Sequence, residues 1–142
     1  MLTALEFYGH GEHRYLVEGI HNWLSRLPDN PNADGADKLW SCHGICRAVR
    51  DSFKLGSEWI VVDGHFMRAG QEHAWLINAD RTLILDVLPV AALGGPLLVD
   101  AHSYGSPWPG AYLSAHYPKD RFYRFLEETE LIMEVYAKHN RS

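Results

Sequence analysis

The sequence is poor in cysteine, with only Cys42 and Cys46 among 142 residues. Small secreted domains that cannot build a core depend on several disulfides, and two cysteines are too few for such a framework. At 142 residues and 46% hydrophobic composition, the chain is long enough to bury a core without them. We therefore expect a single domain over residues 1–142.

The sequence also lacks an excess of positive charge. It has 13 Lys and Arg against 18 Asp and Glu, a formal net charge of −5, and the basic residues are scattered along the chain. This charge distribution argues against nucleic acid and anionic membranes as partners.

Long apolar runs and a signal-like N-terminus are missing as well. No window approaches the roughly 20 apolar residues of a membrane-spanning helix. Residues 1–8 have neither a basic start nor a continuous apolar stretch. We expect a cytoplasmic protein without a signal peptide or transmembrane segment.

Hydrophobic periodicity divides the chain into helices and strands. Spacings of three and four predict helices over 12–27, 41–55 and 120–139. Short runs rich in Val, Ile, Trp and Leu predict an antiparallel meander over 58–67, 72–78 and 82–88. The last helix is expected to bury Phe122, Phe125, Leu126, Ile132, Met133 and Tyr136.

Two stretches are rich in turn-forming residues. Residues 29–37 predict a surface loop. Residues 89–117 carry many Gly, Pro, Ser and aromatic residues and predict a long loop with little regular structure, of the kind that often has a function.

The two cysteines lie four positions apart in "SCHGIC". Helical residues at this spacing have Cβ atoms about 5–6 Å apart, whereas a disulfide needs about 3.8 Å, so we expect no bridge. A zinc site needs about four ligands, and a His10-x-x-His13 pair is the best candidate to complete one. Ligand counting therefore makes zinc a minor alternative, and we expect no metal and no cofactor.

Cys42 occupies a special position if Ser41 is the N-cap of the predicted helix. The unpaired N–H groups and the dipole at a helix start stabilise a thiolate. The same N–H groups can hold the oxyanion of a carbonyl under attack. Cys46, one turn further in, is expected to be a core residue.

A hairpin over residues 72–89 offers a base for this thiol. With a tip at 79–80, residue 77 would face 82, residue 75 would face 84, and His73 would lie directly opposite Asp86. At that separation a carboxylate can orient an imidazole. Cys42, His73 and Asp86 would then serve as a nucleophile, its base and the residue that orients the base.

These motifs resemble the core of the transglutaminase-like branch of the papain-like cysteine hydrolases, over about residues 40–90. The resemblance rests on a Cys at a helix start, "HAWL" on one strand and "LDVLP" on the next. It implies an α+β fold in which the nucleophile helix packs on a small antiparallel sheet, with extra N- and C-terminal helices. It also implies acyl-enzyme chemistry (amidase, protease, deamidase or transglutaminase) on a peptide or protein amide.

The resemblance makes His73 the base and Asp86 its partner, and it leaves two candidates for the nucleophile. Many family members start with Gly-x-Cys, which matches Gly44 to Cys46. The segments "CHGICRAV" and "VVDGHF" resemble a group of small bacterial proteins and favour Cys42. No papain-type Gln precedes the nucleophile, so the resemblance provides no side chain for the oxyanion hole.

Several further residues are candidates for contacts with a substrate, namely His43, Trp75, Trp108 and Tyr112. Asp63 and His65 flank Gly64 and are expected in a solvated turn. Asp100 and His102 are a spare carboxylate and histidine in the long loop. A binding module that keeps the fold without catalysis, and a zinc protein, remain alternatives to a cysteine hydrolase or acyltransferase.

Overall fold

The computed structural model describes residues 13–31, 39–66, 71–89, 96–100 and 112–141. Within these ranges the chain forms three helices and one five-stranded antiparallel sheet, so the fold is α+β. The elements are α1 (Arg14–Ser25), α2 (Cys42–Ser52), β1 (Trp59–Phe66), β2 (Gln71–Asn78), β3 (Leu83–Asp86), β4 (Leu97–Asp100), β5 (Tyr112–Ser114) and α3 (Lys119–His139). The three predicted helices and the predicted meander are confirmed.

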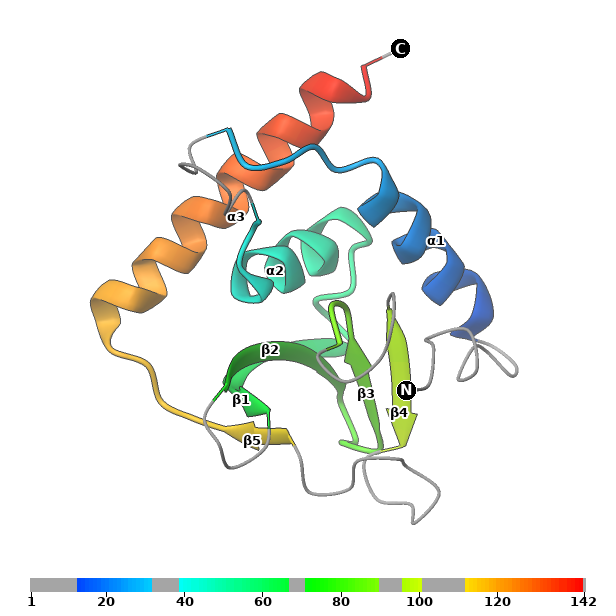
Figure 1. The fold of residues 1–142 in the computed structure, drawn as a ribbon. Coiled ribbons are helices and arrows are strands. Elements are labelled where there is room, and N and C mark those ends of the chain that lie inside the picture. Colours follow the sequence, from blue (N-terminus) through cyan, green and yellow to red (C-terminus); the bar gives the residue numbers. More distant parts are fainter. Residues whose placement is uncertain (1–12, 32–38, 67–70, 90–95, 101–111, 142) are drawn as a thin grey trace.

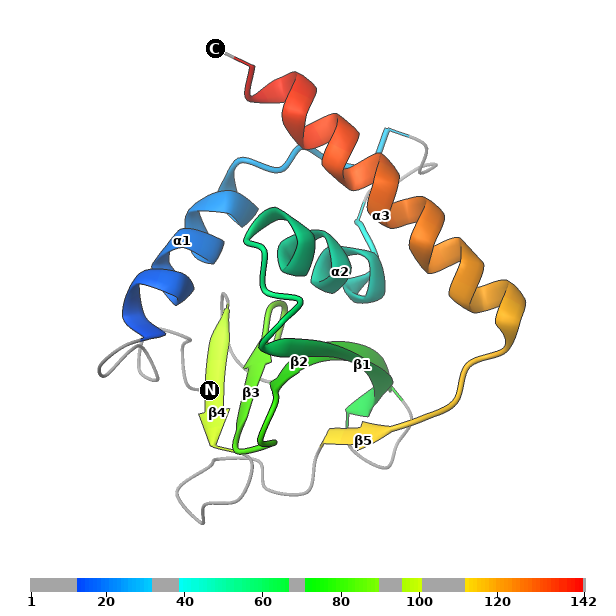
Figure 2. The same ribbon diagram turned by 180° about the vertical axis from the view of Figure 1, so that it is seen from behind.

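Figure 1 and Figure 2 show α2 between the sheet and the other two helices. It packs on α3 and on strands β1 and β2. Val17 and Ile20 of α1, Val49 of α2 and Leu76 of β2 belong to one buried cluster. Because α2 is held on several sides, its first turn has a fixed position over the sheet.

The sheet has the strand order β4-β3-β2-β1-β5. Side chains alternate across each strand, so Leu76 joins the cluster under the helices, whereas Trp75 joins a second buried cluster with Ile84, Leu97 and Val99. Gly64 of β1 is required where β5 approaches, because a Cβ there would lie 2.1 Å from the carbonyl oxygen of Leu113. Both faces of β2 are buried over residues 73–76.

The β2–β3 hairpin differs from the predicted register. Ile77 pairs with Ile84 and Leu76 with Leu85, so the predicted partners 77 with 82, 75 with 84 and 73 with 86 are wrong. The cause is a longer turn, in which Asp80 accepts hydrogen bonds from the Thr82 N–H and hydroxyl. The register moves by two residues, and a shift by two keeps every side chain on its predicted face.

The predicted long loop contains two strands. β4 pairs with β3, and β5 pairs with β1, so the prediction of little regular structure over 89–117 is wrong for these segments. Both strands are short, four and three residues, and flanking Gly and Pro residues hide them in the sequence. Residues 90–95 and 101–111 lie outside the described ranges, as do residues 32–38 of the predicted surface loop.

The last helix buries a narrower stripe than predicted. Phe125 and Ile132 are buried, but Phe122 and Leu126 are 40% and 37% exposed, so the prediction is wrong for these two. Residue 126 is rotated about 100° from residue 125 on a helix. Phe122 lies in the first turn, where the Arg47 guanidinium covers its ring. No helix in the described ranges combines the length and apolar character needed to cross a bilayer.

Candidate active site

Ser41 caps α2 as predicted, and it places Cys42 at the first helical position. The Ser41 hydroxyl accepts a hydrogen bond from the Gly44 N–H at 3.1 Å. From α3, the Glu128 carboxylate bonds the Ser41 hydroxyl and, at 3.4 Å, its N–H. The first N–H groups of a helix have no intrahelical acceptor, so the Cys42 N–H is available at this point.

His73 and Asp86 form a buried pair. The His73 Nε2 lies 2.9 and 3.0 Å from the two carboxylate oxygens of Asp86, and the residues are 1% and 0% exposed. In the observed register Asp86 is diagonal to His73 rather than directly opposite. Diagonal neighbours on one face remain within reach of long side chains, so the predicted pair forms despite the wrong register.

Cys42 is the cysteine that contacts this pair. Burial alone lowers the pKa of an imidazole, but hydrogen bonds to Asp86 and Cys42 raise the pKa of His73 to about 9. Because Asp86 occupies Nε2, Nδ1 is the ring nitrogen left for the thiol. The structure thus places Cys42 close enough to interact with His73, whose ring is held by Asp86.

Cys46 lies in a different environment. It is fully buried in the cluster under the helices, and neither cysteine is in a disulfide. Burial, followed by the nearby charges of Cys42 and Asp86, raises the pKa of the Cys46 thiol well above its ordinary value. A thiol that stays protonated and covered is inert, which favours Cys42 as the nucleophile.

A second buried network lies behind the first turn of α2. Asp63 accepts two hydrogen bonds from Arg47, at 2.9 and 2.6 Å, and lies 2.8 Å from the His43 Nδ1. Burial raises the pKa of the Asp63 carboxyl, but the bonds from His43 and Arg47 outweigh it and lower this pKa to about 2. The network ties α2 to β1.

This network corrects three sequence-based expectations. His43 is 3% exposed and its ring stacks on Phe125 at 4.1 Å, so it is packed inside rather than open to a substrate. The periodicity of the predicted helix over 41–55 puts Arg47 on the side opposite the apolar stripe, but Arg47 is 4% exposed. Asp63 lies within β1 instead of a solvated turn. The spacing of His43 and Arg47, one helical turn apart, was the available signal for their shared partner.

The remaining candidates have mixed outcomes. Trp75 is 3% exposed within the second cluster, which leaves no surface for a substrate. The Tyr112 hydroxyl bonds Asp86 at 2.8 Å, a role that the sequence did not indicate. His65 lies in β1 and its ring stacks on that of Tyr117. Asp100 ends β4, whereas His102 and Trp108 lie outside the described residues.

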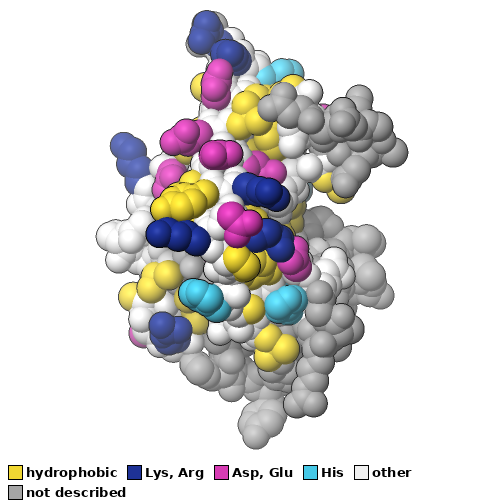
Figure 3. Space-filling view, turned by 90° about the vertical axis from the view of Figure 1, so that its left-hand side faces the viewer, with side chains coloured by type: hydrophobic (Ala, Val, Ile, Leu, Met, Phe, Trp, Pro, Cys, Tyr) yellow, Lys and Arg dark blue, Asp and Glu magenta, His cyan; other side chains and the backbone are white. Residues whose placement is uncertain are grey.

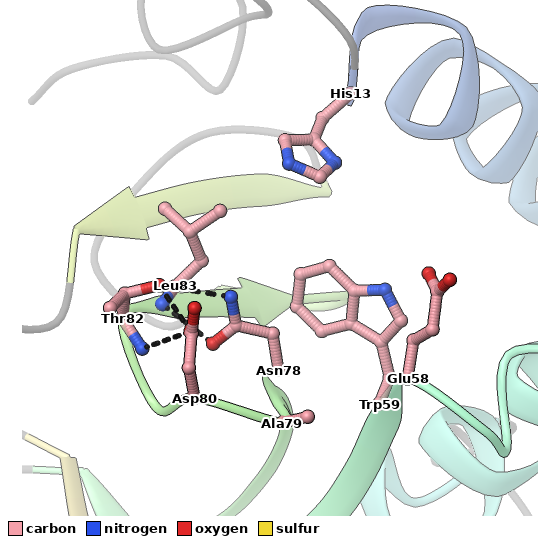
Figure 4. A pocket seen from close by; sticks show the side chains of 8 residues that line it. All are labelled: His13, Glu58, Trp59, Asn78, Ala79, Asp80, Thr82 and Leu83. Atoms are coloured by element: carbon pink, nitrogen blue, oxygen red, sulfur yellow. Dashed lines mark hydrogen bonds between the residues drawn. The ribbon is translucent and has the colours of Figure 1, made fainter.

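Neither of the two hollows described next is lined by Cys42. One, of about 480 Å³, is lined by Asp63, Ala115, His116, Tyr117, Lys119 and Phe122. The other, of about 340 Å³, lies beside Trp59 and the β2–β3 turn (Figure 4). The turn is at the opposite end of β2 from His73, so the second hollow is separate from the site.

The surface over α3 is mixed in charge. Figure 3 shows acidic and basic side chains interleaved with apolar ones on this face. Arg121 of α3, for example, donates two hydrogen bonds to Glu72 of β2, at 3.0 and 2.8 Å. Charges of both signs therefore alternate on this face and do not form a patch of one sign.

No metal cluster is found in the part of the chain that the structure describes, since no three His, Cys, Asp or Glu side chains are grouped closely enough to hold an ion. His10, of the sequence pair with His13, lies outside that part. The comparisons with protein-family models, curated proteins and solved structures find no match to this chain.

Proposed function

We propose that the chain is a cysteine hydrolase or acyltransferase with a papain-like, transglutaminase-like core, acting on a peptide or protein amide. The observation that carries this proposal is the contact of Cys42, at a capped helix start, with a histidine whose other nitrogen is held by a buried carboxylate. A nucleophile, base and orienting group in this order are the parts that covalent acyl transfer needs. Two free thiols also suit a reducing compartment such as the cytoplasm.

In the proposed reaction, the raised pKa of His73 keeps its ring protonated, and Cys42 reacts as its thiolate. The thiolate attacks the amide carbonyl, and the new oxyanion accepts a hydrogen bond from the Cys42 N–H at the start of α2. His73 then donates its Nδ1 proton to the leaving amine as the C–N bond breaks. This step leaves a thioester on Cys42 and a neutral imidazole.

The second half returns the enzyme to its starting state. Neutral His73 takes a proton from water, or from an acceptor amine, as that molecule attacks the thioester. The C–S bond breaks, the acyl group leaves as an acid or a new amide, and the thiolate and imidazolium are restored. Asp86 keeps its charge throughout and holds the imidazolium in place.

Alkylation by iodoacetamide tests the proposal. An ordinary thiol with a pKa near 8.5 is about 1% thiolate at pH 6.5, so we expect Cys42 to react at least about tenfold faster than that fraction allows. His73→Ala should remove the acceleration, whereas Cys46→Ala should keep it. Acyl transfer itself is tested with p-nitrophenyl acetate, which should leave an acetyl group on Cys42 that mass spectrometry detects.

The control is Cys42→Ala, which should abolish both labels. If wild-type Cys42 reacts no faster than an ordinary thiol and His73→Ala does not change its rate, the proposal is wrong. A binding module without catalysis would then be the better reading of this fold.

A further inference from the structure

Tyr112 connects an edge strand to the centre of the candidate site. It is the first residue of β5, which pairs with β1 on the far side of β2 from β3. Its hydroxyl nevertheless donates to the Asp86 Oδ2 at 2.8 Å. Tyr112 of β5 and His73 of β2 therefore both bond the Asp86 carboxylate, although β5 and β2 are not neighbours in the sheet.

The ring of Tyr112 is held firmly enough to fix this bond. It packs edge to face against Phe66 at 5.3 Å and Trp75 at 5.2 Å, and its centroid is 6.4 Å from that of His73. Burial, followed by the Asp86 charge, raises the pKa of the phenol. The hydroxyl is therefore a neutral donor at neutral pH.

The polar groups around His73 come from three elements. Asp86 of β3 bonds its Nε2, Cys42 of α2 contacts the ring, and Tyr112 of β5 reaches it through Asp86. Cys46, also on α2, is close enough for the Asp86 charge to raise the pKa of its thiol. Among these groups, Tyr112 is the uncharged one that donates a hydrogen bond to Asp86.

We propose that Tyr112 is a positioning residue of this site, whose hydrogen bond sets how strongly Asp86 holds the proton of His73. The inference rests on the proposed function. A buried carboxylate that accepts a second hydrogen bond is better stabilised as an anion and attracts a neighbouring proton less strongly. Without the bond, Asp86 would hold the imidazolium more tightly, and His73 would become a poorer proton donor to the leaving amine.

Tyr112→Phe tests this inference, because it removes the hydroxyl and keeps the ring in its packing. We expect the His73 titration midpoint, followed by NMR of labelled imidazole, to rise by about one pH unit. We also expect acetylation of Cys42 by p-nitrophenyl acetate to shift its pH profile. Tyr123→Phe is the matched control, since Tyr123 lies on α3 and is 52% exposed, and it should leave the midpoint unchanged.

A folded Tyr112→Phe variant with an unchanged His73 midpoint overturns the inference. If that variant does not fold, 3-fluorotyrosine in the wild-type sequence provides a second measurement. The more acidic phenol donates more strongly and should lower the midpoint, and no shift there overturns the inference as well. Failure of the proposed function would be seen separately, as a wild-type Cys42 whose reactivity does not depend on His73.

Discussion

Cys42 and Cys46 differ in chemistry because they occupy different positions on the same helix. Cys42 starts α2, directly after its N-cap Ser41, and is in contact with His73. Cys46 is one turn further in, with no exposed surface. The same side chain is thus a candidate nucleophile at one position and core packing at the other.

Cys46→Ala tests this division. It removes one buried sulfur atom and leaves a small cavity, so we expect the free energy of unfolding to fall by about 1 kcal/mol. The rate at which Cys42 reacts with iodoacetamide should stay within about twofold of the wild-type rate. Urea unfolding and alkylation kinetics measure the two effects.

Cys42→Ala is the counterpart and should show the opposite pattern, a small change in unfolding free energy and a complete loss of alkylation at neutral pH. A loss of fast alkylation in Cys46→Ala with Cys42 intact would assign the nucleophile to Cys46. The class of chemistry would be unchanged by that result.

At the scale of elements, the start of α2 is fixed by contacts from outside the helix. Ser41 caps the helix, and Glu128 of α3 bonds both the hydroxyl and the N–H of that cap. A Cβ on Gly44 would lie 2.2 Å from a carboxylate oxygen of Glu128, so the glycine leaves room for this contact. The negative carboxylate also interacts favourably with the positive end of the helix.

Ser41→Ala removes the cap and the acceptor of the Gly44 N–H. We expect it to lower the free energy of unfolding by about 1 kcal/mol, the usual cost of losing a Ser cap. It should also slow alkylation of Cys42, because fraying of the first turn moves the thiol away from His73. Urea unfolding and the alkylation rate at pH 6.5 measure these changes.

Ser52→Ala is the matched control, since Ser52 is the last residue of the same helix and is exposed. It should change neither quantity appreciably. Equal effects of the two substitutions would mean that the cap does not hold the site in place.

At the scale of the whole molecule, one histidine–carboxylate pair lies within the sheet and a second joins α2 to the sheet. His73 and Asp86 connect β2 to β3 beside Cys42. His43 and Asp63, together with Arg47, connect α2 to β1. The first pair contacts the thiol, and the second supports the helix that carries it.

These two pairs predict a stability profile with an acid and a basic limb. The Asp63 pKa is lowered from 3.8 to about 2, so its contribution is present above about 3.8 and is lost as the pH falls through 2. The His73 pKa is raised from 6.5 to about 9, so its contribution is present below 6.5 and is lost as the pH rises through 9. The free energy of unfolding, measured in urea across this range, should therefore fall at both ends.

Variants separate the two limbs. Asp63→Asn should flatten the acid limb and destabilise the protein by about 3 kcal/mol at neutral pH, because it leaves the buried Arg47 without its partner. Asp51→Asn is the control, since Asp51 is exposed and pairs with Arg50 at the surface. An acid limb that is the same in wild type and Asp63→Asn would show that other carboxylates produce it.

Much of the candidate site could be predicted from the sequence because it depends on local patterns. A Ser before an apolar stripe of period 3.6 marks a helix start and places Cys42 there. The period of two on neighbouring strands put His73 and Asp86 on one face, and an error of two residues in the register did not separate them. The turn length was missed because the side chains of Asp80 and Thr82 stabilise a longer turn than the predicted one.

The sequence by itself determined the helix that starts at Cys42, the strands that carry His73 and Asp86, and the shared face of these two residues, because backbone preferences and side-chain periodicity act over a few residues. Only the tertiary structure decided which groups distant in the sequence complete the site. Tyr112 reaches Asp86 across 26 positions, and Glu128 reaches Ser41 across 87. No local pattern encodes such contacts, since they depend on how the sheet and α3 pack around α2.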